Sequence, residues 1–168
     1  MSTTHGREGR HRRRISPAER LYLAAARPGR PLVVQLVVEG RGDLDPRELR
    51  RALSATSDAF PGARLLRRRR WWVDSRRTPP VRRVAASATG EVDPNGPDLR
   101  RGLDPGSGPT CEVLLATDDA GVARAVVFRA FHGVMDGRGV LLWAAGVFRA
   151  LRGEPVAPAT DAQTDVGL

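Results

Sequence analysis

The side chain best suited to acid–base chemistry in this sequence is His132, which lies in residues 131–137 (FHGVMDG). This H-x-x-x-D-G segment follows an apolar run, residues 125–128, that predicts a buried strand, and it precedes a helical pattern over 138–152. The sequence therefore places a histidine at the end of a strand, where an imidazole can exchange a proton near neutral pH. The alternative role for His132 is that of a core histidine whose nitrogens are satisfied by the backbone.

Length and composition limit the classes of protein. A chain of 168 residues can form one modest domain with a real core. The single cysteine, Cys111, excludes an internal disulfide and a multi-cysteine zinc site, and it fits a reducing compartment. The chain has no apolar run of about 18 residues and no apolar signal core behind its basic N-terminus. We therefore expect no membrane span, no resident metal and a cytoplasmic protein.

The positive charge is concentrated in two segments. Residues 1–14 carry five Arg and one Glu, and residues 64–83 carry nine Arg and one Asp, which leaves the remainder of the chain slightly acidic. Because Trp71 and Trp72 adjoin this second segment, a nucleic-acid surface is one interpretation. A strand edge protected by arginines, together with a disordered tail, is the favoured one, since charge without a binding motif is weak evidence.

The N-terminal half predicts two helices around a strand. Residues 16–19 (SPAE) form a capping box, so a helix should run over about 17–26. Residues 32–39 are rich in valine and leucine and predict a strand. A second helix should begin at Asp45-Pro46, and one face of it is apolar. The residues on that face are Leu49, Ala52, Leu53 and Thr56.

The C-terminal half predicts a hairpin of strands and a helix. Residues 64–74 favour a strand pair, whereas residues 75–109 are expected to be irregular, with one helical turn over 98–103. Strands are expected over 111–117 and 122–131, joined by the turn DDAG. The last helix should bury an apolar face and end at Gly153. The residues of that face are Val140, Trp143, Ala144, Val147, Phe148 and Leu151. This order predicts an α/β fold, a two-layer sandwich in which helices cover one face of a mixed sheet of about four to five strands.

Several segments, in this order, resemble the N-terminal half of the chloramphenicol-acetyltransferase-like superfamily. That group includes peptide-synthetase condensation domains, polyketide-associated acyltransferases and wax-ester synthases. The similar segments are SPAERLY at 16–22, LDPRELRRAL at 44–53, FPGAR at 60–64, LD with GP between 103 and 109, FHGVMDG at 131–137 and RG at 152–153. The resemblance covers about residues 16–156, and agreement across several segments counts for more than one motif. It divides the chain into a disordered basic arm (1–14), an acyltransferase-like half-domain (15–156) and a flexible tail (157–168).

The resemblance implies a mechanism and roles for three residues. His132 would be the general base that accepts a proton from an amine or hydroxyl as it attacks an acyl thioester. Asp136 would be structural, pairing with an arginine to hold the loop, and Gly137 would allow a tight turn. The acyl donor would be coenzyme A or the phosphopantetheine arm of a carrier protein, with no tightly bound cofactor. Phe131 replaces the first histidine of the family's His-His pair, and we interpret it as strand-end packing.

Members of this superfamily are about twice as long or more, because a second, similar half forms the opposite wall of the active-site tunnel. Three hypotheses follow. The chain is half of a split acyltransferase or condensation enzyme, completed by a second chain or by homo-oligomerisation. It is instead a non-catalytic half-domain that binds a carrier protein, an acyl chain or a partner enzyme. The third and weakest hypothesis is a basic nucleic-acid-binding protein.

Overall fold

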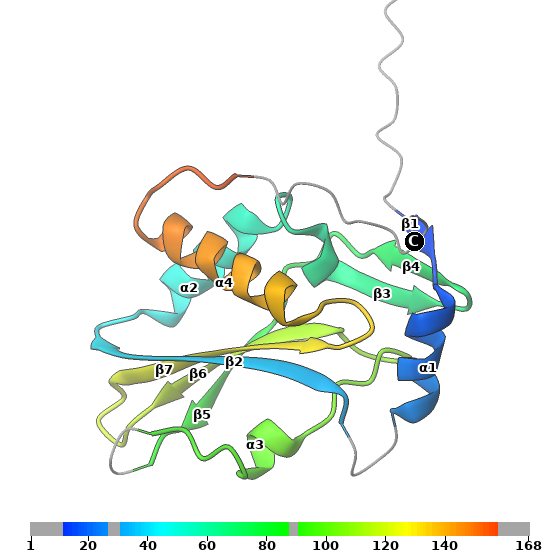
Figure 1. The fold of residues 1–168 in the computed structure, drawn as a ribbon. Helices are drawn as coiled ribbons and strands as arrows, with labels where there is room; N and C mark the ends of the chain where they lie inside the picture. Colours follow the sequence, from blue (N-terminus) through cyan, green and yellow to red (C-terminus); the bar gives the residue numbers. More distant parts are fainter. Residues whose placement is uncertain (1–11, 27–30, 88–90, 158–168) are drawn as a thin grey trace, which may run out of the picture.

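The computed structural model describes residues 12–26, 31–87 and 91–157. The described strands and helices are mixed along the chain, and the strands build two separate sheets (Figure 1). The predicted α/β class is therefore confirmed, although the second sheet was not anticipated. Most of the predicted N-terminal arm and all but the first residue of the predicted tail lie outside the described residues.

A four-stranded mixed sheet in the order β2-β7-β6-β5 forms the centre of the molecule. β2 (Val33–Gly42), β7 (Ala123–Phe131) and β6 (Cys111–Thr117) are antiparallel neighbours, whereas β5 (Val81–Ala85) runs parallel to β6. The predicted β6–β7 hairpin is confirmed, with Gly121 in its turn at a φ of +80° that favours glycine. β6 and β7 lie in the interior of the sheet, so nearly all of their side chains are buried on both faces.

Helices α2 (Pro46–Thr56) and α4 (Gly137–Leu151) cover one face of this sheet (Figure 1). The four residues predicted for the apolar face of α2 are all buried. The α4 prediction is confirmed for Val140, Trp143, Ala144 and Val147, while Phe148 and Leu151 are partly buried. Phe128 of β7 meets the Trp143 ring edge-on at 5.1 Å between ring centres. This helix–sheet layer holds the main core.

The opposite face of the sheet is covered by the segment that the sequence predicts to be irregular. Its short helix α3 (Pro97–Arg100) buries Leu99 against Leu114 and Val127. The prediction for 75–109 is wrong at residues 81–85, because Val81 to Ala85 form the edge strand β5. Two valines separated by two arginines give no alternating pattern, and the pairing of β5 with β6 is set by tertiary contacts rather than by local sequence.

The second sheet contains three short antiparallel strands in the order β1-β4-β3. The predicted strand pair is confirmed as the hairpin of β3 (Leu65–Arg68) and β4 (Trp71–Asp74). β1 (Arg12–Arg14) pairs with β4, so the expected disordered arm is incorrect for its last three residues. The Trp71 ring helps to hold β1 in place. The Arg12 guanidinium lies 4.3 Å from the centre of this ring, and an aromatic face attracts a cation.

In the part of the chain that the structure describes, no helix is long and apolar enough to cross a membrane. The same residues contain no group of three or more histidine, cysteine, aspartate or glutamate side chains that could hold a metal ion.

Candidate functional site

His132 follows the last residue of β7 and is held by contacts with two N-terminal elements. Its backbone N–H donates to the carbonyl of Leu32, 2.9 Å away, which ties the loop to the start of β2. Its ring stacks on Tyr22 of α1 (Pro17–Ala25), with 4.5 Å between ring centres and 14° between planes. The side chain is half-buried. The loop after β7 therefore presents the imidazole beside α1 rather than inside the main core.

The sequence positions α1, and thereby Tyr22, through a complete capping box. The Ser16 hydroxyl accepts from the N–H of Glu19 at 3.2 Å, and the Glu19 carboxylate accepts from the N–H of Ser16 at 2.7 Å. Glu19 also pairs with Arg13 of β1 at 2.6 Å. These contacts satisfy free N–H groups of the first turn and attach α1 to the three-stranded sheet.

The two ring nitrogens of His132 have different surroundings. Nδ1 is buried and has no hydrogen-bond partner among the described residues. Nε2 is not one of the buried atoms that lack a partner. Nε2 is therefore the candidate for contact with a substrate. A neutral imidazole in this orientation can accept a proton at Nε2 when Nδ1 carries the hydrogen.

Asp136 supports the loop in a way that differs from the prediction. It is the N-cap of α4, and its carboxylate accepts from the N–H of Gly139 at 2.7 Å. In the part of the chain described, this N–H and not an arginine is its partner. Arg64, the arginine of the FPGAR segment, pairs with Asp58 and Asp74 instead, each at 2.7 Å. The carboxylate thus fixes the start of the helix after His132 through capping.

The described half-domain shows no local requirement for glycine at position 137, where the resemblance implies a tight turn. Gly137 has no positive φ, and a Cβ added there would meet nothing within 4 Å. The neighbouring glycines are the ones that sterics require. A Cβ on Gly133 would lie 2.5 Å from the Phe131 ring, and one on Gly139 would lie 2.6 Å from the Met135 side chain.

Phe131 is buried and packs against Trp72, with 6.4 Å between ring centres, as the interpretation of strand-end packing requires. Its close contact with Gly133 fixes the path of the backbone through the turn that carries His132. The glycine two positions after Phe131 was the signal in the sequence that could have identified this contact.

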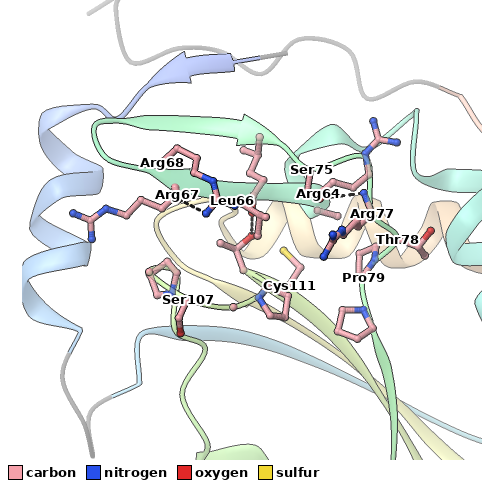
Figure 2. A pocket seen from close by; sticks show the side chains of 18 residues that line it. Arg64, Leu66, Arg67, Arg68, Ser75, Arg77, Thr78, Pro79, Ser107 and Cys111 are labelled. Carbon is pink, nitrogen blue, oxygen red and sulfur yellow. Dashed lines mark hydrogen bonds between the residues drawn. The ribbon is translucent and has the colours of Figure 1, made fainter. Parts of the chain in front are cut away.

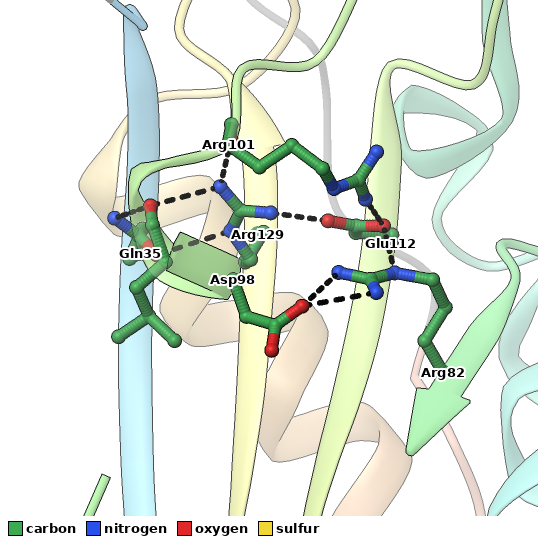
Figure 3. Close-up of polar contacts among 7 residues, drawn as sticks. Gln35, Arg82, Asp98, Arg101, Glu112 and Arg129 are labelled. Atoms are coloured by element: carbon green, nitrogen blue, oxygen red, sulfur yellow. Dashed lines mark hydrogen bonds and ion pairs between the residues drawn. The ribbon is translucent and has the colours of Figure 1, made fainter. Parts of the chain in front are cut away.

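A buried charged cluster lies on the face of the sheet opposite the main helices, and sequence reasoning missed it (Figure 3). Arg129 and Glu112 face each other from β7 and β6, with their side chains 0% and 2% exposed, and form an ion pair. Glu112 also pairs with Arg101 and with Arg82, the latter at 3.3 Å. Desolvation lowers the pKa of Arg129, while the nearby Glu112 carboxylate opposes that shift.

The backbone and Gln35 satisfy the other groups of this cluster. Arg129 donates to Gln35 at 3.0 Å and to the carbonyls of Leu99 and Arg101. Gln35 donates to the Leu99 carbonyl at 3.1 Å. Because each of these donors has an acceptor, the cluster serves to fasten the 97–103 segment to the sheet and is not arranged for proton transfer.

Comparisons with known proteins identify the fold. No protein-family model matches the sequence, and no curated protein matches it. Among solved structures, tallysomycin biosynthesis protein TlmII is similar over 85% of this chain and 39% of its own length, with 22% identity and a TM-score of 0.64. The epimerization domain from the third module of tyrocidine synthetase B is similar over 94% of this chain and 40% of its own, with 12% identity and a TM-score of 0.68.

The starter condensation domain of the rhizomide synthetase RzmA is similar over 90% of this chain and 40% of its own, with 22% identity and a TM-score of 0.62. The chain has the chloramphenicol-acetyltransferase-like fold of peptide-synthetase condensation and epimerization domains, and it corresponds to their N-terminal half. It spans about two-fifths of the length of these structures.

Proposed function

We propose that this protein is the N-terminal half of a condensation-type acyltransferase. A complementary half, on a second polypeptide, on a second copy or in continuation of the same chain, completes the active site. The observation that carries the proposal is the position of His132: in a chain with the fold of condensation domains, this imidazole follows directly after the last residue of β7, and its Nδ1 is buried.

The proposed reaction transfers an acyl group from a thioester to an amine or a hydroxyl. Nε2 of His132 accepts the proton of the nucleophile as its nitrogen or oxygen attacks the thioester carbonyl. The carbon–sulfur bond then breaks, and the protonated imidazole returns the proton to the departing thiolate. The donor is acyl coenzyme A or an acyl group on the phosphopantetheine arm of a carrier protein. Asp136 takes no part in proton transfer and fixes the loop by capping α4.

Exposed apolar side chains support the requirement for a complementary half. Leu21 of α1 is 72% exposed, and the adjacent Leu141 and Leu142 of α4 are 56% and 47% exposed. Both helices flank the His132 loop, since α1 provides Tyr22 and α4 begins directly after that loop. A second half that covers this region would remove apolar surface from water and would exclude water from the reacting thioester.

The experiment is reconstitution of the two halves. The chain is co-expressed with the C-terminal half of a condensation domain as a separate polypeptide, and the complex is isolated by size-exclusion chromatography. Free thiol and acylated product are then measured with acyl coenzyme A and acyl carrier protein as donors, and with amine and hydroxyl acceptors. The proposal predicts product from the complex only. A complex that forms but transfers no acyl group from either donor to either acceptor contradicts it.

The buried Nδ1 of His132, which lacks a partner, favours a second candidate function. Catalytic imidazoles are usually oriented by a hydrogen bond at the second nitrogen, and none is present among the described residues. The second candidate is a non-catalytic half-domain that binds a carrier protein or a partner enzyme. Stable binding of a carrier protein by a complex without transferase activity would support this candidate.

A further inference from the structure

A second candidate site lies in a pocket of about 360 Å³ whose described lining does not include His132. Three segments form its walls: residues 63–68 with strand β3, residues 75 and 77–80 after β4, and residues 105–111 before and at the start of β6. Figure 2 shows Leu66 and Arg68 on one side of the pocket, with Ser107 and Cys111 opposite. The volume is within the range of small-molecule sites.

Backbone and side-chain hydrogen bonds hold these walls together. The Thr110 hydroxyl donates to the carbonyl of Leu65 at 2.5 Å, which connects the 105–111 segment to β3. The N–H of Ser75 donates to the carbonyl of Arg64 at 3.0 Å. The Ser75 hydroxyl then accepts from the N–H of Arg77 at 3.1 Å, so the backbone that carries this arginine is fixed. The pocket is therefore formed before any ligand arrives.

The lining carries four arginines and no acidic residue. Arg64 is neutralised by its ion pairs with Asp58 and Asp74. The Arg67 side chain extends toward α1 in Figure 2. Nearby Asp104 is outside the lining, and its carboxylate accepts from Gly106 and Ser107 of its own loop.

Two arginines of the pocket remain without a counter-charge. The hydrogen bond described for the Arg68 guanidinium is a long one, 3.5 Å, to the carbonyl of Arg67. Arg77 also lines the pocket, and the described residues form no ion pair with it. A smaller hollow of about 150 Å³ is lined by Arg68 and Arg77 as well, so both stand at the boundary of the two hollows. Asp74 also lines this smaller hollow, and its carboxylate is paired with Arg64. Two unpaired guanidiniums at one pocket provide donors for a planar or tetrahedral oxyanion.

We infer that this pocket binds a phosphate-bearing small molecule, with Arg68 and Arg77 holding the phosphate and the apolar walls contacting its organic part. The walls suit such a ligand because Leu66, Pro79 and Pro109 line the same pocket. A site for nucleic acid fits less well. The pocket is a hollow about the size of one small molecule, and Trp71 is occupied by the Arg12 and Arg14 guanidiniums rather than open for base stacking.

The test is calorimetric titration of the full chain with inorganic pyrophosphate, chosen because it carries the phosphate chemistry without an organic part. The ionic strength is held at about 0.15 M, where nonspecific attraction is screened over about 8 Å. We expect a dissociation constant below about 1 mM. The double variant Arg68→Gln/Arg77→Gln should bind about tenfold more weakly or worse, because charge-assisted hydrogen bonds are lost.

Two further variants keep the result interpretable. Arg50→Gln removes an exposed arginine of α2, away from the pocket, and should bind pyrophosphate like the natural chain. Thr78→Glu places a carboxylate on the lining without removing an arginine, and it should weaken binding to a similar degree as the double variant. Equal affinity in the double variant and in Arg50→Gln overturns the inference. Binding of a 20-nucleotide single strand without binding of pyrophosphate also overturns it. None of these outcomes depends on acyl transfer.

Discussion

Removal of the Glu112 carboxylate should destabilise the fold strongly, because it leaves a guanidinium in the interior without a counter-charge. In Glu112→Gln, the Arg82 and Arg101 guanidiniums can turn toward water, since their side chains are 36% and 47% exposed. Arg129 cannot, because its side chain is 0% exposed. An uncompensated buried charge of this kind costs about 3–5 kcal/mol in the free energy of unfolding. For a domain of this size, the melting temperature should fall by about 6–20 °C.

The assay is thermal and urea unfolding of the variant beside a matched control. The control, Glu154→Gln, removes a surface carboxylate that forms ion pairs with Arg149 and Arg152. It should change the melting temperature little, because exposed ion pairs contribute little to stability. The double variant Glu112→Gln/Arg129→Gln should be less unstable than the sum of its single variants, which reports the coupling of the pair. If Glu112→Gln melts like Glu154→Gln, the interpretation of the cluster as a buried, tightly paired network is refuted.

Three further predictions concern the helix after the site and the lone thiol. Gly146→Ala should destabilise the fold by about 1–3 kcal/mol, because the added Cβ would lie 2.4 Å from the Phe60 ring. The control Gly137→Ala should be neutral or stabilising, since its Cβ would meet nothing within 4 Å. Equal melting temperatures of the two variants would contradict this prediction. Asp136→Ala should cost about 0.5–2 kcal/mol in unfolding experiments because a cap is lost, and a loss above 3 kcal/mol would indicate a second partner for the carboxylate. Burial raises the pKa of the Cys111 thiol to about 12, so iodoacetamide at about pH 8 should label it only after unfolding; rapid labelling of the folded chain would refute this.

The sequence was sufficient for elements whose pattern is local. The apolar face of α2, the capping box of α1 and the β6–β7 hairpin all have signals within a few residues, and each is found where it was expected. β5 was missed because its partner is parallel to it and about 30 residues distant, and because arginines occupy its centre. β1 was missed because a run of three arginines favours a solvated arm, while its pairing with β4 depends on tertiary contacts.

In the candidate site too, features with a local sequence pattern could be predicted, whereas features that depend on tertiary contacts could not. The position of His132 between a strand and a helix could be predicted, because the apolar run before it and the helical pattern after it are both local. Its contact with Tyr22 could not, since the two residues are brought together by the docking of α1. Sequence also could not separate the glycines: Gly133 is required by the Phe131 ring, whereas Gly137 faces open space in this half-domain.

The proposal that His132 is the general base is tested most directly by acyl transfer and thermal unfolding of His132→Ala in the reconstituted complex. Tyr22→Phe is the control variant, because it retains the ring that stacks on the imidazole. We expect His132→Ala to lose a factor of about 10²–10⁴ in transfer rate while its melting temperature stays close to that of Tyr22→Phe. Full transfer activity in His132→Ala would contradict a role as base, and a large loss of stability would identify His132 as a packing residue.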